Sequence, residues 1–210
     1  ILKVAGSLQK SEGRVTAYYP LSVKKQAKSV QNLLEKAIDY YNRHLGINFP
    51  ISVVLFGSEE YARLTKESSG ETAQYNEFLP FVTPGPPKVM CLPAISGSAL
   101  DSLTQLALKQ SPSLKKLNLS IPEISQRFTA LVGLHELGHQ YIRELEICQD
   151  VHWLQEMLAN FIADAFLTDV SPADSLIWQT VNHAYDTYLK PANRTFSGIH
   201  KGNQENYVWW

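Results

Sequence analysis

The pattern of apolar and polar residues in the first quarter of the chain predicts a strand, a long helix and a second strand. Residues 13–19 are rich in β-branched and aromatic side chains and end at Pro20, which is typical of a strand. Apolar residues then recur at helical spacing from about Leu21 to Leu45, and Gly46 is a suitable stop. Residues 50–56 form an almost unbroken apolar run, which indicates a buried strand beside the first.

The middle of the chain carries weaker signals. We expect a short helix at residues 59–67 and a proline-rich loop at residues 70–87, which could form the rim of a cleft. Residues 88–92 are a strand candidate, and the prolines on both sides favour a position at the edge of the sheet. Such an edge could bind an extended peptide by adding a strand to the sheet.

From about residue 97 onward the apolar pattern is mostly helical. Ser120, Pro122 and Glu123 form a helix start signal, because Ser120 can cap the backbone and Glu123 can reach back to it. We expect two further helices, at about residues 151–167 and 173–189. Together with the N-terminal strands, these helices predict an α+β fold.

The helix that begins near Ser120 carries two histidines at the spacing of metal ligands, in the run His135-Glu136-Leu137-Gly138-His139. Side chains four residues apart on a helix are separated by about 6 Å along the axis and about 40° around it, so both imidazoles can reach one ion. Zinc suits such a pair, and a catalytic zinc site adds a third protein ligand and a water. Glu136 follows the first histidine, where its carboxylate can lie beside that water without binding the metal.

The motif alone arises by chance in on the order of one per cent of shuffled chains of this composition. Its setting on the chain strengthens the prediction of a metal site. Both histidines share a helix face with apolar residues and therefore point inward, where a histidine pair without metal would need other partners. The apolar residues of this face are Ile124, Phe128, Leu131, Val132 and Ile142. Glu156, on the next helix, is the best candidate for a third ligand, because an unpaired carboxylate among its apolar neighbours would be costly. Ala159 and Ala163 would let the two helices approach closely.

These residues resemble a known family. The run HELGH, followed by W-L-Q-E-x-x-A-N with 16 residues between His139 and Glu156, looks like the gluzincin metallopeptidases, and particularly the small bacterial peptidase MA-like domains. The resemblance is specific for about residues 120–168. It implies one zinc ion bound by His135, His139 and Glu156, with Glu136 as the general base. Many gluzincins have an acidic residue four positions after the ligand glutamate. Here that position is Asn160, which can still accept a hydrogen bond, and Asp164 lies one turn further.

The resemblance also implies an architecture and an activity. We expect residues 1–210 to form a single metallopeptidase-like catalytic domain, with an α/β upper lobe at about residues 1–95 and a helical lower lobe at about residues 96–210. In such a zincin-like domain a mixed sheet and a long helix come first, an edge strand lies over the cleft, and the helical part carries the zinc site. The expected reaction is hydrolysis of peptide bonds by a metal-activated water. Its oxyanion needs a further donor, for which the candidates are Tyr207, His183 and His200.

Two alternatives remain open. Peptide deformylases also have an H-E-x-x-H helix, with a cysteine ligand some forty residues upstream, and Cys91 lies 44 positions before His135. Against this, the chain has no glycine-rich motif near its N-terminus, and about 70 residues follow the motif. The other alternative is a non-catalytic zinc-binding interaction domain, although the presence of Glu136 argues against a degenerate site.

Composition narrows the range of partners. A hydrophobic content of 44% and a charged content of 19% are typical of a folded globular protein, and the net charge of -1 without a basic cluster argues against nucleic acid. No apolar run is long enough to span a membrane. The chain opens at Ile1 without a leader, so we expect a trimmed, extracytoplasmic protein that is secreted or surface-anchored in a bacterium and acts on peptide or protein substrates. Cys91 and Cys148 are compatible with one bridge or two thiols, and the oligomeric state stays open.

Overall fold

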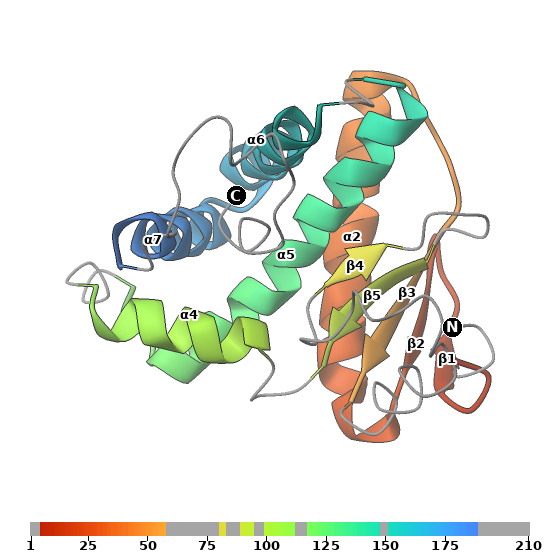
Figure 1. Cartoon of the computed structure of the whole chain (residues 1–210). Coiled ribbons are helices and arrows are strands. Elements are labelled where there is room, and N and C mark those ends of the chain that lie inside the picture. Colours follow the sequence, from red (N-terminus) through yellow and green to blue (C-terminus); the bar gives the residue numbers. More distant parts are fainter. Residues whose placement is uncertain are drawn as a thin grey trace. The chain divides into compact units, whose positions relative to one another are not determined.

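The computed structural model describes residues 5–57, 80–82, 89–94, 99–111, 117–147 and 151–188. The chain divides into two compact units, Ile1–Ser102 and Leu103–Trp210. The first unit combines a sheet with a long helix and the second is helical, as Figure 1 shows, so the predicted α+β class is confirmed. The helix expected at residues 59–67 lies outside the described residues, as does most of the loop expected at residues 70–87.

A five-stranded mixed sheet forms the first unit, with the strand order β1-β2-β3-β5-β4. Its strands are β1 (Gln9–Ser11), β2 (Val15–Tyr19), β3 (Ile51–Phe56), β4 (Phe81–Val82) and β5 (Val89–Pro93). The pairs β2–β3 and β3–β5 are parallel, whereas β1 pairs with β2 and β4 with β5 in antiparallel fashion. The strands predicted at residues 13–19, 50–56 and 88–92 are therefore confirmed. The short strands β1 and β4 were not predicted.

The predicted edge position of residues 88–92 is wrong, because β5 lies between β3 and β4. All five residues of β5 are buried, as is typical of an interior strand in a parallel arrangement. Pro93 is itself the last strand residue and lies opposite Phe56. The prolines therefore mark the ends of the strand and not the edge of the sheet. On this side the described sheet ends in β4, which pairs with Met90 and Cys91 of β5, and at the other side it ends in β1.

Helix α2 (Lys24–Leu45) packs against the sheet through β2, and Figure 1 shows it along one face. Its start differs slightly from the prediction, because residues Leu21–Val23 form a 3-10 turn. Gly46 ends the helix with a φ of 70°, in the left-handed region that glycine adopts without strain. The side chain of Gln31 donates from Nε2 to the Val15 carbonyl at 2.7 Å, which ties the helix to β2.

The apolar residues of β3 are buried on both sides of the sheet. Because successive residues of a strand point to opposite faces, Val53 and Leu55 lie on one side, and Val54 and Phe56 on the other. Val54 and Phe56 belong to an apolar cluster that also contains Ala5, Val89 and Cys91. Burial on both faces explains why this strand appears in the sequence as an unbroken apolar run.

Four helices account for the described part of the chain after the sheet, and three of them build the second unit. They are α4 (Ala99–Lys109), which crosses the boundary between the units, α5 (Ile121–Glu144), α6 (His152–Val170) and α7 (Pro172–Tyr188). Helices α5, α6 and α7 each contact the other two, so they pack together as a three-helix bundle. The predicted start of α5 is confirmed, because the Ser120 N–H donates to Glu123 Oε2 at 2.8 Å and the Glu123 N–H donates to Ser120 Oγ at 3.4 Å.

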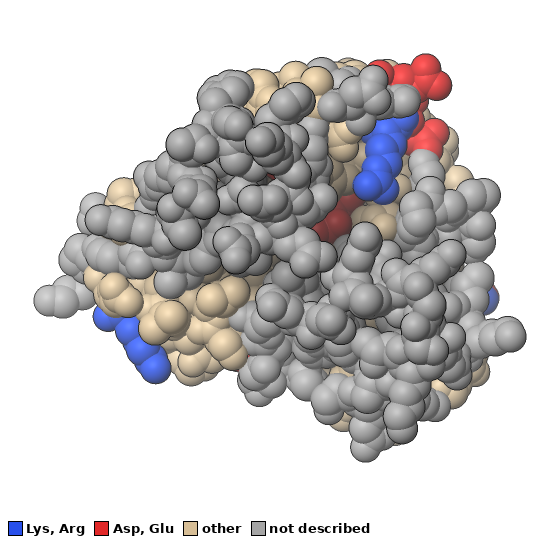
Figure 2. Space-filling view, viewed as in Figure 1, with Lys and Arg blue, Asp and Glu red and all other residues tan. Residues whose placement is uncertain are grey.

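None of the described helices is both long and apolar enough to cross a membrane. On the face drawn in Figure 2, few of the described side chains are Lys or Arg.

Candidate metal centre

Helices α5 and α6 approach each other closely at Gly138, the fourth residue of the HELGH run. A Cβ atom at this position would lie 3.0 Å from both the Cα and the carbonyl oxygen of Ala159 on α6. Such distances are shorter than ordinary van der Waals contacts, and helix backbone atoms cannot rotate away from them. Glycine therefore permits this approach, which brings the side chains of α6 that flank Ala159 up to the histidines of α5.

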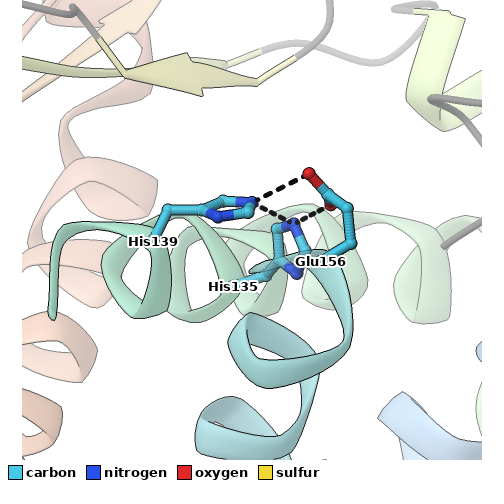
Figure 3. A group of neighbouring side chains, drawn as sticks. All are labelled: His135, His139 and Glu156. Atoms are coloured by element: carbon cyan, nitrogen blue, oxygen red, sulfur yellow. Dashed lines mark hydrogen bonds and ion pairs between the residues drawn. The ribbon is translucent and has the colours of Figure 1, made fainter. Parts of the chain in front are cut away.

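His135 and His139 from α5 meet Glu156 from α6, and Figure 3 shows the three side chains pointing toward one another. His135 Nε2 lies 3.2 Å from Glu156 Oε2, and His139 Nε2 lies 3.4 Å from Glu156 Oε1. The two Nε2 atoms are 3.0 Å apart. The three side chains are between 11 and 13% exposed, so they form a nearly enclosed cluster. The structure thus brings together the three residues predicted as ligands.

Asn160, one turn beyond Glu156 on α6, contacts the outer nitrogen of His135. The distance from His135 Nδ1 to Asn160 Oδ1 is 3.0 Å. An amide oxygen only accepts hydrogen bonds, so this contact assigns the proton of the neutral imidazole to Nδ1. The lone pair of Nε2 then points into the cluster, as a metal ligand requires.

The cluster brings nitrogen and oxygen acceptor atoms together, and the pKa values of Glu156 and His135 reflect this. Burial by itself would raise the pKa of Glu156, but hydrogen bonds from His135 and His139 hold it far below its usual range. Burial by itself would lower the pKa of His135, but the hydrogen bond to Glu156 and the charge of Glu136 raise it above its ordinary value. Two imidazole nitrogens and a carboxylate at these distances need a cation between them, either a proton or a metal ion.

The spacing of the ligand atoms fits one metal ion. In a tetrahedral zinc site with ligand bonds of about 2.0–2.1 Å, neighbouring ligand atoms lie about 3.4 Å apart. In the cluster the two Nε2 atoms are 3.0 Å apart, and the nitrogens of His135 and His139 lie 3.2 and 3.4 Å from the two different oxygens of the Glu156 carboxylate. One ligand atom from each side chain can be chosen so that all lie within 4.8 Å of one another. These side chains could therefore hold an ion without a rearrangement of the two helices.

The remaining residues predicted for the site have different surroundings. Glu136 is half-buried on α5 between the two histidines, and no hydrogen bond or ion pair joins it to another described residue. Asp164 faces α7, where its Oδ1 accepts a hydrogen bond from Gln179 Nε2 at 3.5 Å. His183 is exposed on α7. Tyr207 and His200, the other candidate oxyanion donors, lie outside the described residues.

Two residues of α5 were not singled out from the sequence. Gly138 had a signal, because glycine within a helix costs about 1 kcal/mol relative to alanine and so often indicates a packing constraint. Gln140 is fully buried, and neither its Nε2 nor its Oε1 has a hydrogen-bond partner among the described residues. Its polar side chain beside Tyr141 and Ile142 was a signal as well.

Comparison with protein-family models, with curated proteins and with solved structures finds no match to this chain. Cys91, the ligand of the deformylase alternative, lies in the apolar cluster with Val54 and Phe56. Cys148 lies outside the described residues, so a bridge between the two cysteines stays a hypothesis.

Proposed function

We propose that this protein is a zinc-dependent metallopeptidase of the gluzincin type. One zinc ion would be bound by His135, His139 and Glu156, with Glu136 as the general base. The observation that carries the proposal is the convergence of one ligand atom from each of these three side chains to within 4.8 Å of one another. The two histidine Nε2 atoms are 3.0 Å apart, and each lies 3.2 or 3.4 Å from a different oxygen of the Glu156 carboxylate, distances close to the ligand separations of a tetrahedral zinc site. The sequence resemblance supports the same residues.

The donor set favours zinc over harder cations. Mg²⁺ and Ca²⁺ prefer oxygen ligands, whereas two imidazole nitrogens with one carboxylate are a common set for catalytic zinc. Three protein ligands leave a fourth position for water or substrate. The hydrogen bond from His135 to Asn160 Oδ1 supports this choice, because it leaves Nε2 unprotonated for the metal.

In the proposed reaction, Glu136 moves the proton. Bound zinc supplies a Lewis acid that polarises water and the scissile carbonyl. Glu136 accepts a proton from the attacking water as the new carbon–oxygen bond forms. It then delivers this proton to the nitrogen of the leaving amine as the carbon–nitrogen bond breaks. The half-buried carboxylate follows His135 directly and is not itself a member of the ligand cluster, which suits this role.

Two features weigh against the deformylase alternative. The position of the third ligand is filled by Glu156, so the histidines need no cysteine to complete the set. Cys91 lies among Val54, Phe56 and Val89, surroundings in which a thiol behaves as a small apolar side chain.

The proposal is tested by loading the purified protein with zinc and measuring cleavage of a peptide library by mass spectrometry. We expect one zinc per chain, and cleavage that falls about 10²- to 10⁴-fold in Glu136→Gln, the range typical of a lost general base. Glu146→Gln, an exposed glutamate just after α5, is the matched control and should behave as the wild type.

Three results of these experiments would each contradict a different part of the proposal. If zinc does not bind, the metal site is wrong. If zinc binds but no peptide is cleaved more by the wild type than by Glu136→Gln, the non-catalytic zinc-binding domain is favoured. If Cys91→Ser loses zinc while Glu156→Gln retains it, the deformylase-like ligand set replaces the proposed one.

A further inference from the structure

Gln140 is an energetically unusual side chain in the second unit. Its exposed fraction is 0%, and neither its amide donor nor its amide acceptor has a partner among the described residues. Burying an amide without hydrogen bonds is unfavourable, and buried polar groups are nearly always paired with protein or with ordered water. A partner for this amide is therefore expected close by.

Glu136 lies one helical turn before Gln140 on α5. Residues four apart on a helix share a face, with Cβ atoms about 6 Å apart, and helical side chains lean toward the N-terminal turn. The Gln140 side chain is accordingly expected to extend toward the turn that carries Glu136. The Glu136 carboxylate can only accept hydrogen bonds, and the Gln140 amide is a donor on the same face.

We propose that Gln140 is a positioning residue for Glu136. Its Nε2–H donates to the Glu136 carboxylate through one buried water and fixes the carboxylate in the orientation in which it accepts a proton. This inference rests on the proposed function, since it assigns the base that Gln140 serves. Gln140 makes no hydrogen bond to the side chains of the three proposed metal ligands among the described residues.

The substitution Gln140→Met separates this role from a structural one. Methionine fills a similar volume without hydrogen bonds, and replacing an unpaired buried amide by an apolar group of similar shape is close to neutral or stabilising. Gln126→Met, at an exposed position of the same helix, is the matched control. For each variant, the zinc Kd, the thermal midpoint, kcat and KM for a peptide that the wild type cleaves are measured.

We expect kcat of Gln140→Met to fall between about tenfold and 100-fold, the loss typical of a misplaced catalytic group, with KM and the zinc Kd within about twofold of the wild type. The thermal midpoint should not fall. In a Glu136→Gln background the same substitution should change residual turnover by less than about twofold, because the two residues act as one unit. Gln126→Met should match the wild type.

A second measurement needs neither turnover nor metal. The side-chain amide resonances of Gln140 in the zinc-free protein, identified by their absence in Gln140→Met, should shift in Glu136→Gln and stay in place in Glu146→Gln. If Gln140→Met does not fold, Gln140→Leu takes its place and the resonances are assigned from that variant.

The inference is overturned if Gln140→Met retains wild-type kcat, if its loss of activity follows a weaker zinc Kd, or if the amide resonances ignore Glu136→Gln. In all three cases a large effect of Glu136→Gln on cleavage would leave the proposed peptidase function standing. Absence of that effect would instead remove the proposed function itself.

Discussion

Replacing Gly138 by alanine tests how the packing of α5 on α6 determines the metal centre. The added Cβ would lie 3.0 Å from the Cα and the carbonyl oxygen of Ala159. Carbon atoms pack at about 3.5 Å or more, so α6 has to move away by about 0.5 Å. Glu156 and Asn160 flank Ala159 on that helix, and their side chains would move with it. Metal–ligand distances tolerate about 0.2 Å, so the displacement exceeds what the site can absorb unchanged.

Stability and metal affinity should respond differently to Gly138→Ala. Alanine gains about 1 kcal/mol in helix propensity, whereas overpacking costs about 1–3 kcal/mol, so the free energy of unfolding of the metal-free protein should fall by roughly 0–2 kcal/mol. Zinc affinity should fall at least about tenfold, because the carboxylate and the amide that orients His135 both shift.

Zinc Kd is measured by competition with a chromophoric chelator, and stability by urea unfolding in the presence of a chelator. Ala159→Gly provides a specific control, since the predicted clash is with the backbone of Ala159 and not with its methyl group. Combining it with Gly138→Ala should therefore not restore zinc affinity. A Gly138→Ala protein that is more stable than the wild type and binds zinc equally well would refute the reasoning.

Three further predictions concern the same unit. Asn160→Leu should weaken zinc binding about 10- to 100-fold, because the leucine cannot accept the hydrogen bond from His135, while Asn160→Asp should retain zinc binding. If chelator competition gives the same zinc Kd for Asn160→Leu and the wild type, the contact with His135 does not have this role. In the metal-free protein, the raised pKa of His135 stabilises the fold fully below its ordinary 6.5 and less as the pH rises through the raised value. The lowered pKa of Glu156 stabilises fully above its ordinary 4.5 and less as the pH falls through the lowered value. The difference in unfolding free energy between the wild type and Glu156→Gln should thus be largest between pH 4.5 and 6.5, and a flat profile in urea unfolding would count against this ion pair. Ser120→Ala should lower the unfolding free energy by about 1 kcal/mol through loss of the helix cap and leave the zinc Kd unchanged. A higher zinc Kd in this variant would contradict the prediction, because it would show that the helix cap affects the metal site.

The sequence predicts those parts of the fold that local chemistry determines. The start of α5 depends on the side chains of Ser120 and Glu123, and the end of α2 on a glycine with positive φ, so both are visible in short stretches of residues. The His135, His139 and Glu156 set is predictable for a related reason, since helical periodicity places both histidines on one face and the second helix supplies a costly buried carboxylate.

Features that depend on distant partners were not predictable in this way. The prolines near β5 suggest an edge, but its position between β3 and β4 follows from pairing with Phe81–Val82, a two-residue strand with too few positions to show periodicity. Asp164 was a candidate because it lies one turn after Asn160. Its contact with Gln179 depends on where α7 packs, which no pattern within α6 encodes.

The HELGH run and the glutamine after it serve three purposes in six residues: metal binding by His135 and His139, proton transfer by Glu136 with Gln140, and close packing on α6 at Gly138. The helix places the packing position and the proton-transfer residues on different sides. With 100° per residue, Glu136 and Gln140 each lie about 160° around α5 from Gly138, and about 40° from one another. A displacement of α6 at Gly138 therefore reaches the metal through Glu156 without directly displacing the base. It follows that Gly138→Ala should lose zinc affinity yet regain most of its kcat at saturating zinc. Gln140→Met should show the opposite pattern, with zinc affinity kept and kcat reduced. If both variants lose the same property, the division of this helix into a metal-binding side and a proton-transfer side is wrong.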